Sequence, residues 1–236
     1  MKGRVGLRAL LIVAVLAGAC ERGPVDATAT APAAPVASEP VTASASPPAV
    51  PAAVPATVPA TGRLEQATFA SGCFWCTESD FDKVAGVVST VSGYTGGRVV
   101  NPTYQQVSSG GTGHVESVEV RFDPAVVTYE QLLEVYWHNV DPFSGRGQFC
   151  DFGEQYRPVI WVHTAAQRAA ADASKARMTR AFKRPIAVTI EAAVRFFPAE
   201  EEHQDFHARS SVRYSYYRWG CGRDARLAEI WKSASY

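Results

Sequence analysis

The sequence lacks an excess of charge of either sign. It contains 23 lysines and arginines against 23 aspartates and glutamates, so its formal net charge is zero. Nucleic-acid-binding proteins usually carry a basic excess and cation stores carry acidic runs, so neither class is indicated.

Cysteine is also sparse. Five scattered cysteines exclude a small disulfide-built scaffold and leave room for one or two redox pairs, drawn from Cys20, Cys73, Cys76, Cys150 and Cys221.

Long hydrophobic runs are missing as well, except for one near the N-terminus. Residues 10–19 are apolar or small, follow three cationic residues, and are too few to span a bilayer as a helix. This pattern predicts a signal peptide over residues 1–19. Leu16–Cys20 also resembles the lipobox of bacterial lipoproteins, with Ala17 where Leu is usual. We therefore expect lipidation of Cys20, with plain cleavage as the alternative.

The chain divides into three parts by composition. Residues 20–62 are rich in Ala, Pro, Val, Thr and Ser and hold nine of the fifteen prolines, which predicts a disordered tether. Residues 63–236, roughly 170 residues, are enough for one domain with its own core. An exported domain on such a tether is expected in the periplasm or cell envelope, as a monomer.

Hydrophobic periodicity predicts interleaved strands and helices in this domain. Strands are expected at residues 66–70, 87–93, 114–122, 159–163 and 186–196, and helices at 73–84, 128–140, 164–182, 199–207 and 224–232. Asn101 as an N-cap before Pro102 predicts one more short helix. Thr128 with Gln131, and Thr164 with Gln167, predict caps for the two long helices. The order indicates an α+β fold, a mixed β-sheet with helices packed on it.

Cys73 stands between a predicted strand, which ends before Gly72, and the start of a predicted helix. A helix N-terminus stabilises negative charge, so we expect the pKa of this thiol to fall below its usual value of about 8.5 and Cys73 to be a nucleophilic thiolate. The alternative is a buried structural cysteine.

Cys73 and Cys76 also form a Cys-x-x-Cys, which has two further interpretations. One is a thioredoxin-like redox pair, and the other is half of a zinc site completed by Cys150 and Cys221. Between the two cysteines stand Phe74 and Trp75, whose bulk is more typical of pocket walls.

Glu116 shares strand parity with Val118, Val120 and Phe122, whereas Glu119 lies on the opposite face. A carboxyl on a buried apolar face has a raised pKa, so Glu116 is expected to stay protonated near neutral pH and to act as a general acid. The alternative is a glutamate at the strand end that reaches water.

Several further motifs occur in a fixed order, together with a polar loop at residues 149–158. They are Gly72-Cys73-Phe74-Trp75, Gly93-Tyr94-Thr95-Gly96-Gly97, Asn101-Pro102-Thr103-Tyr104, Gly113-His114-Val115-Glu116, Asp151-Phe152-Gly153-Glu154-Gln155-Tyr156-Arg157, and Phe197-Pro198-Ala199-Glu200 followed by His203-Gln204. In this order they resemble the motifs of the A-type methionine sulfoxide reductases, over residues 66–207.

The resemblance implies a ferredoxin-like core and reduction of methionine S-sulfoxide, free or in proteins, without a bound cofactor or metal. Cys73 would attack the sulfur while Glu116 protonates the oxygen. The other implied site residues are Phe74 and Trp75 as walls for the substrate methyl group, Tyr104 and Tyr156 as hydrogen-bond donors to the oxygen, and Asp151 as a shaping residue. Cys73 would become a sulfenic acid, then part of a disulfide that an external thioredoxin-like dithiol reduces.

The recycling route is left open, because the sequence departs from the family at Cys76, Ser108, Cys150 and Glu202. We expect Cys221, in a flexible Gly-Cys-Gly stretch, to join the relay with Cys150 as its partner, and Cys76 is the alternative first resolver. A structural Cys150–Cys221 disulfide is a further alternative. Two other functions stay open: a thiol-disulfide oxidoreductase using Cys73 and Cys76, and a lipid-tethered binding domain without catalysis.

Overall fold

The structure is a computed structural model that describes residues 63–234. The predicted signal peptide (1–19) and tether (20–62), including Cys20, lie outside the described residues. Within residues 63–234, none of the helices combines the length and the apolar character that a membrane crossing requires.

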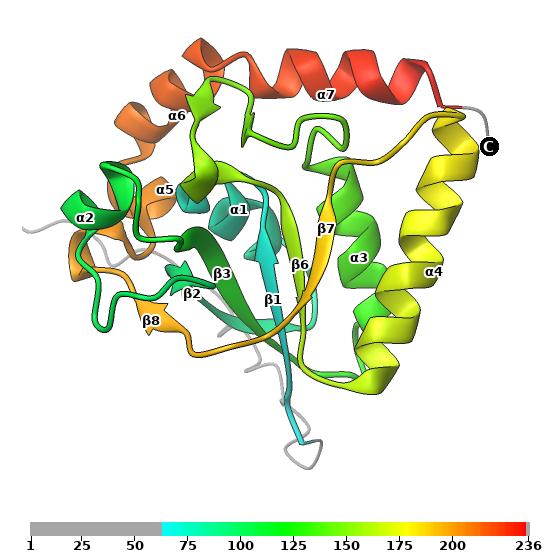
Figure 1. The fold of residues 1–236 in the computed structure, drawn as a ribbon, viewed down its shortest axis with the longest axis horizontal. Helices are drawn as coiled ribbons and strands as arrows, with labels where there is room; N and C mark the ends of the chain where they lie inside the picture. Colours follow the sequence, from blue (N-terminus) through cyan, green and yellow to red (C-terminus); the bar gives the residue numbers. More distant parts are fainter. Residues whose placement is uncertain (1–62, 235–236) are drawn as a thin grey trace, which may run out of the picture. The chain divides into compact units, whose positions relative to one another are not determined.

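A six-stranded sheet forms the centre of the domain, in the order β7-β6-β1-β3-β2-β8 (Figure 1). Neighbouring strands are antiparallel except β6 and β7, which run parallel, so the predicted mixed sheet is confirmed. The strands are β1 (Glu65–Ala70), β2 (Val87–Thr95), β3 (Val115–Phe122), β6 (Val159–Val162), β7 (Thr189–Ala192) and β8 (Phe197–Pro198). A separate two-stranded ladder consists of β4 (Gly147–Gln148) and β5 (Asp151–Phe152).

Helices pack on this sheet mainly through one large apolar cluster. Alternate strand residues such as Phe69, Val118 and Ile160 pack with helix residues such as Leu132 and Met178. The α+β fold is therefore as predicted. The helices are α1 (Phe74–Phe81), α2 (Tyr104–Ser108), α3 (Tyr129–His138), α4 (Ala165–Phe182), α5 (Phe206–Arg209), α6 (Ser211–Gly220) and α7 (Arg223–Lys232), with short 3₁₀ turns η1 (Glu154–Tyr156) and η2 (Glu201–His203).

The predicted N-cap at Asn101 is wrong. Thr103 caps α2 instead, because its hydroxyl accepts from the backbone N–H of Gln106 while the Gln106 side chain accepts from the backbone N–H of Thr103. This reciprocal pair satisfies two backbone donors, one more than an asparagine cap supplies. The same capping box is present at Thr128 and Gln131, as predicted. At α4 the Thr164 cap is confirmed.

The C-terminal third differs most from the prediction. Of the strand expected at 186–196, only Thr189–Ala192 forms a strand, which is β7. The helix expected at 199–207 is interrupted at Asp205, whose φ is 52°. Helix α6 was not predicted. The Gly-Cys-Gly stretch is also not a flexible tail, because Cys221 is the C-cap of α6 and Gly222 turns the chain into α7 with φ 67°. Figure 1 shows α6 and α7 joined directly at this turn.

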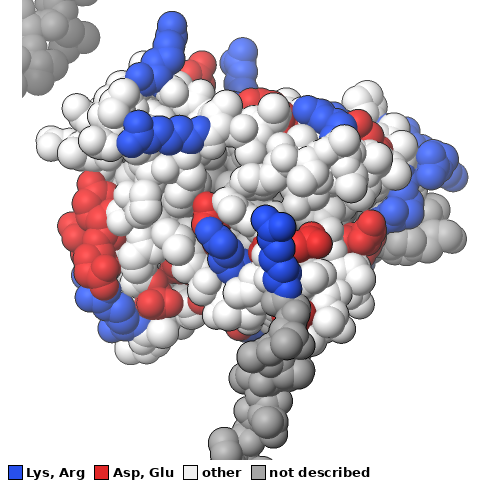
Figure 2. Space-filling model, turned by 90° about the horizontal axis from the view of Figure 1, so that it is seen from below, with Lys and Arg blue, Asp and Glu red and all other residues white. Residues whose placement is uncertain are grey.

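Charged residues of both signs occur on the face that Figure 2 shows, interspersed with uncharged side chains. This distribution agrees with a net charge of zero.

Candidate active site

The site is built around the turn from β1 into α1. Gly72 makes this turn with φ 92°, and a Cβ there would lie 2.6 Å from the Cβ of Gln148, so the position requires glycine. Cys73 follows as the N-cap of α1, and its carbonyl accepts from the backbone N–H groups of Cys76 and Thr77. The predicted placement of Cys73 at a helix N-terminus is therefore confirmed.

Eight side chains from distant parts of the chain surround one cavity of about 60 Å³ next to Cys73. Seven of them are the catalytic and substrate-binding residues that the sequence predicted, and the eighth, Tyr217 of α6, was missed. They are Cys73, Phe74, Trp75, Tyr104, Glu116, Asp151, Tyr156 and Tyr217.

Glu116 lies on the buried face of β3 and is 2% exposed, as strand parity predicted. Its Oε2 accepts a hydrogen bond of 3.1 Å from the backbone N–H of Phe74. Burial raises the pKa of Glu116 to about 8, against the opposing effect of that hydrogen bond. The carboxyl is therefore mostly protonated at pH 7 and has a proton to donate.

The expected low pKa of Cys73 is wrong. Burial raises the pKa of Cys73 well above its ordinary value, and Cys76, Glu116 and Asp151 add to the effect. Loss of hydration, the neighbouring Cys76 thiol and the nearby carboxyl groups together outweigh the effect of the helix N-terminus. Cys76 shows the opposite behaviour: a hydrogen bond from Cys73 lowers the pKa of Cys76 to about 7, with Arg223 and Arg218 contributing.

Three tyrosines, Tyr104, Tyr156 and Tyr217, line the same cavity. Burial raises the pKa of Tyr104 to about 12 and raises that of Tyr156 further, with Glu116 contributing to both. Both tyrosines therefore remain neutral hydrogen-bond donors. Tyr217 donates to Oδ2 of Asp151 over 2.6 Å, which fixes that carboxylate at the cavity wall.

An aromatic wall closes the other side of the cavity. The Trp75 ring stacks on Phe206 at 3.9 Å between centroids, and its indole N–H donates to Nδ1 of His203 over 3.2 Å. The His203 ring in turn lies 4.3 Å from that of Tyr104. His203 and Phe206 belong to segments whose helical boundaries were mispredicted, and the His203-Gln204 motif was the sequence signal that could have identified the first.

Cys150 and Cys221 form a disulfide with a Cα–Cα distance of 5.0 Å, whereas Cys73 and Cys76 are free and buried. The two disulfide sulfurs lie 3.8 and 4.0 Å from the carboxylate oxygens of Asp151. The zinc interpretation required Cys150 and Cys221 as ligands, and their sulfurs are instead bonded to each other.

The site holds a thiol beside a second thiol, a protonated carboxyl and neutral hydroxyls. Such a site can reduce a substrate whose oxygen must be protonated as it leaves. The fold and site thus define a thiol-dependent oxidoreductase. The family profile described as "Peptide methionine sulfoxide reductase" matches residues 65–235, and the chain belongs to this family. It is therefore an enzyme that reduces methionine sulfoxide.

Relatives and solved structures agree with this assignment. Peptide methionine sulfoxide reductase MsrA of Listeria innocua is 51% identical over 171 residues, which are 72% of this chain and 97% of that protein. MsrA/MsrB of Vibrio cholerae is 49% identical over 72% of this chain and 46% of its own length. The structure is similar to methionine sulfoxide reductase A of Corynebacterium diphtheriae, with TM-score 0.57, 29% identity and coverage of 66% of this chain and 79% of that chain. It is also similar to reduced Mxr1 from Saccharomyces cerevisiae, with TM-score 0.60, 28% identity and coverage of 63% and 86%.

Proposed function

We propose that this enzyme reduces the S epimer of methionine sulfoxide, free or within proteins, with Cys73 as the attacking sulfur. The observation that carries the proposal is the common cavity of about 60 Å³, where Cys73 meets an acid, two phenol hydroxyls and an aromatic wall. A cavity of this size suits a methyl sulfoxide group better than a large ligand.

Each group around the cavity has a part in the chemistry. Phe74 and Trp75 contact the methyl group, and the hydroxyls of Tyr104 and Tyr156 hydrogen-bond the sulfoxide oxygen. Glu116 donates its proton to that oxygen, which makes the sulfur electrophilic towards Cys73. The oxygen is transferred to Cys73, the thioether leaves as methionine, and Cys73 becomes a sulfenic acid.

We propose that Cys76 resolves this sulfenic acid. The Cys76 sulfur attacks the sulfur of Cys73 and the Cys73–Cys76 disulfide forms. The sulfenic hydroxyl leaves as water with the proton that the Cys76 thiol gives up. The support is their placement: Cys76 lies one helical turn after Cys73, with its backbone N–H donating to the Cys73 carbonyl over 3.1 Å, and both thiols are free and buried, whereas Cys150 and Cys221 are already bonded to each other.

The electrons for the next cycle come from an external dithiol of the thioredoxin type, and the enzyme itself carries no bound cofactor. The donor reduces Cys150–Cys221, and the resulting thiols exchange with Cys73–Cys76. The position of the bridge beside Asp151 supports this relay, since Asp151 also lines the cavity of Cys73.

The proposed place of action is the cell envelope, where the protein would repair oxidised methionines from a lipid anchor at Cys20. The support is the sequence of residues 1–62 alone. Expression in a lipoprotein-processing bacterium with labelled palmitate provides the test. The label should enter the wild-type chain and be lost in Cys20→Ser, and an unlabelled wild type would contradict the anchor.

The reaction itself is tested with the two sulfoxide epimers presented separately to the purified enzyme and dithiothreitol. The S epimer should be converted to methionine, the R epimer should not, and Cys73→Ser should be inactive. Substantial turnover by Cys73→Ser, or a preference for the R epimer, would contradict the proposal.

A further inference from the structure

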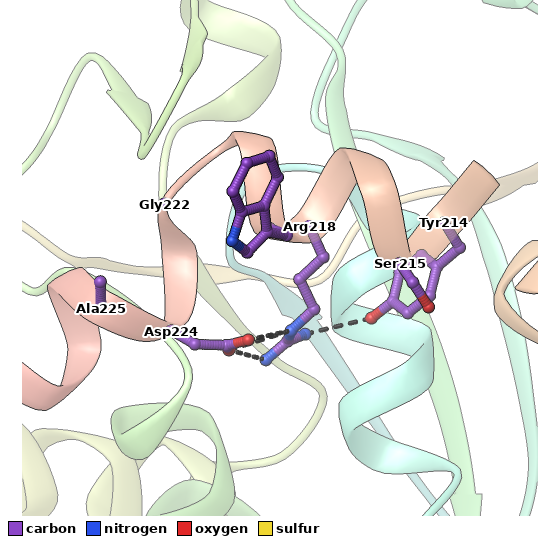
Figure 3. Close-up of a pocket in the computed structure, with 7 residues that line it drawn as sticks. Tyr214, Ser215, Arg218, Gly222, Asp224 and Ala225 are labelled. Atoms are coloured by element: carbon purple, nitrogen blue, oxygen red, sulfur yellow. Dashed lines mark hydrogen bonds and ion pairs between the residues drawn. The ribbon is translucent and has the colours of Figure 1, made fainter. Parts of the chain in front are cut away.

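Buried Arg223 and partly buried Arg218 lie behind the reactive pair, on the side of α1 that carries Cys76. Asp80 stands four residues after Cys76 and therefore on the same face of α1. Its Oδ1 lies 2.9 Å from a guanidinium nitrogen of Arg218, and its Oδ2 lies 3.7 Å from one of Arg223. Figure 3 shows Arg218 reaching from α6 to Asp224 of α7 and to the hydroxyl of Tyr214.

Asp80 is the carboxylate that the two arginines share. The Arg223 and Asp80 side chains are 2% and 6% exposed and that of Arg218 is 15% exposed, so one buried carboxylate faces one buried and one partly buried cation. Asp224 also pairs with Arg218, but it is 66% exposed and screened by water. Nε of Arg223 is buried and, among the described residues, has no hydrogen-bond partner. A buried cation without full compensation is costly, so a further negative group beside these arginines is stabilised.

Cys76 is the group that can supply this negative charge. It is 2% exposed and packs with Phe206 and Tyr214, two residues of the C-terminal helices. The titratable and charged groups that face it from α1, β3, α6 and α7 are Cys73, Asp80, Glu116, Tyr214, Arg218 and Arg223.

The surroundings of Cys73 have the opposite sign. Its cavity contains the carboxyl groups of Glu116 and Asp151. A negative charge on Cys73 would be placed against the carboxylate of Asp151, whereas a charge on Cys76 is placed against the arginines. The directions of the two pKa shifts agree with this division.

We propose that Cys76 carries the thiolate in the resting enzyme and acts as the general base that takes the proton of Cys73 when Cys73 attacks. Arg218 and Arg223 are positioning residues that stabilise this thiolate. The inference rests on the proposed function, since it assumes that Cys73 attacks the sulfoxide. It adds a role for Cys76 before its part in resolution.

The step balances in protons and charge. At the start Cys73 is a thiol, Cys76 a thiolate and Glu116 a carboxylic acid. The Cys73 proton passes to Cys76, the Glu116 proton passes to the sulfoxide oxygen, and a sulfur–sulfur bond forms to the substrate. The hydroxyl then passes from the substrate sulfur to the Cys73 sulfur: the substrate sulfur–oxygen bond and the transient sulfur–sulfur bond break, and a sulfur–oxygen bond forms on Cys73. The products are methionine, the Cys73 sulfenic acid, the Cys76 thiol and the Glu116 carboxylate. Two protons and one negative charge are present on both sides.

The first turnover without reductant isolates this role from resolution, because methionine is released before any disulfide forms. In rapid-quench measurements on the full chain, Cys76→Ser should release methionine about 100-fold more slowly at pH 7, since loss of a general base typically costs that much or more. Burial, the largest cause of the raised pKa of Cys73, remains in this variant, whereas the raising effect of Cys76 is removed. A first turnover as fast as that of the wild type would overturn the proposal.

Thiolate absorbance in the ultraviolet locates the charge directly. The wild type should titrate one thiolate near pH 7, Cys73→Ser should retain it, and Cys76→Ser should lose it. A titration that disappears in Cys73→Ser and survives in Cys76→Ser would place the thiolate on Cys73 and refute the assignment.

The arginines are tested with Arg218→Gln and Arg218→Lys. A rise of one unit in the pKa of Cys76 would lower the thiolate fraction at pH 7 by about fivefold. Arg218→Gln should therefore slow the first turnover about fivefold at pH 7, and its rate should recover at higher pH. Arg218→Lys should retain most of the wild-type rate. The matched control is Arg226→Gln on α7, which removes an arginine paired with Asp141 and should leave the titration unchanged.

The possible results separate the two proposals. If the wild type releases no methionine from the S-sulfoxide, the proposed function fails. If it releases one equivalent but Cys76→Ser does so equally fast, only the role of Cys76 as base fails. If the thiolate of Cys76 titrates at the same pH in the wild type, Arg218→Gln and Arg218→Lys, the arginines do not stabilise it.

Discussion

The backbone N–H of Phe74 donates a hydrogen bond of 3.1 Å to Oε2 of Glu116, so the residue after the nucleophile also holds the acid. Phe74 is the first residue of α1, where backbone N–H groups have no partner within the helix. Glu116 satisfies one of these groups from β3. The distance between the attacking sulfur and the proton donor is thereby fixed by the packing of α1 on the sheet.

Glu116→Gln should keep this hydrogen bond through the amide oxygen but remove the transferable proton. The first turnover should therefore slow by about 10²- to 10⁴-fold, the usual range for loss of a general acid. Rapid-quench release of methionine at pH 7 measures the effect. The matched control is Glu119→Gln, three residues along β3, which lies outside the cavity and should react at the wild-type rate. An unchanged rate for Glu116→Gln would refute the assignment of the acid.

The first turnover should show a bell-shaped pH dependence with its maximum between about pH 7 and pH 8. Cys76 must be deprotonated to accept a proton, so the rate rises as the pH passes its pKa of about 7. Glu116 must be protonated to donate one, so the rate falls above its pKa of about 8. Stopped-flow measurement of the first turnover from pH 5 to pH 10 checks both limbs. In Glu116→Gln the alkaline limb should disappear, and its persistence would assign that limb to another group.

Local sequence patterns were sufficient to predict Cys73 and Glu116. Glu116 was identifiable because the period-two pattern of β3 places it on the same face as Val118 and Val120. Cys73 was identifiable because it stands at a turn from a strand into a helix. The direction in which the pKa of Cys73 shifts was not predictable from such local patterns. It depends on burial and on Asp151, which is 78 residues further along the chain and reaches the site only through tertiary packing.

The C-terminal contributors to the site were missed for a different reason. Helix α6 exposes Val212, Tyr216 and Trp219 and buries Tyr214, so its apolar residues do not mark a single buried face. Tyr217 then had no predicted element to place it. The pairing of Cys150 with Cys221 was expected from the sequence, and the structure confirms that these two residues, 71 positions apart, are bonded.

Tyr217→Phe should weaken substrate binding while leaving the thiol pair intact. The change removes the 2.6 Å hydrogen bond to Asp151 but retains the ring that contacts Trp75 edge-on. Without this hydrogen bond Asp151 is no longer held at the cavity wall. Since the bond contributes roughly 1.5–3 kcal/mol to the folded enzyme and only part of this bears on the substrate, kcat/KM should fall by up to about tenfold. Steady-state kinetics with methionine S-sulfoxide and dithiothreitol measure this. Tyr216→Phe, one residue earlier and exposed, is the control and should leave kcat/KM unchanged.

Replacing both Cys150 and Cys221 by Ser should reveal two separate effects of the disulfide. The bridge closes a loop over 71 residues, so its loss should lower the free energy of unfolding by about 2–4 kcal/mol, measured with denaturant without reductant. Under the proposed relay, the double variant should keep turnover with dithiothreitol, because Cys73 and Cys76 remain. It should lose most of its turnover with a thioredoxin-type donor. Full turnover with that donor despite lower stability would show that the bridge is structural and that Cys73–Cys76 is reduced directly.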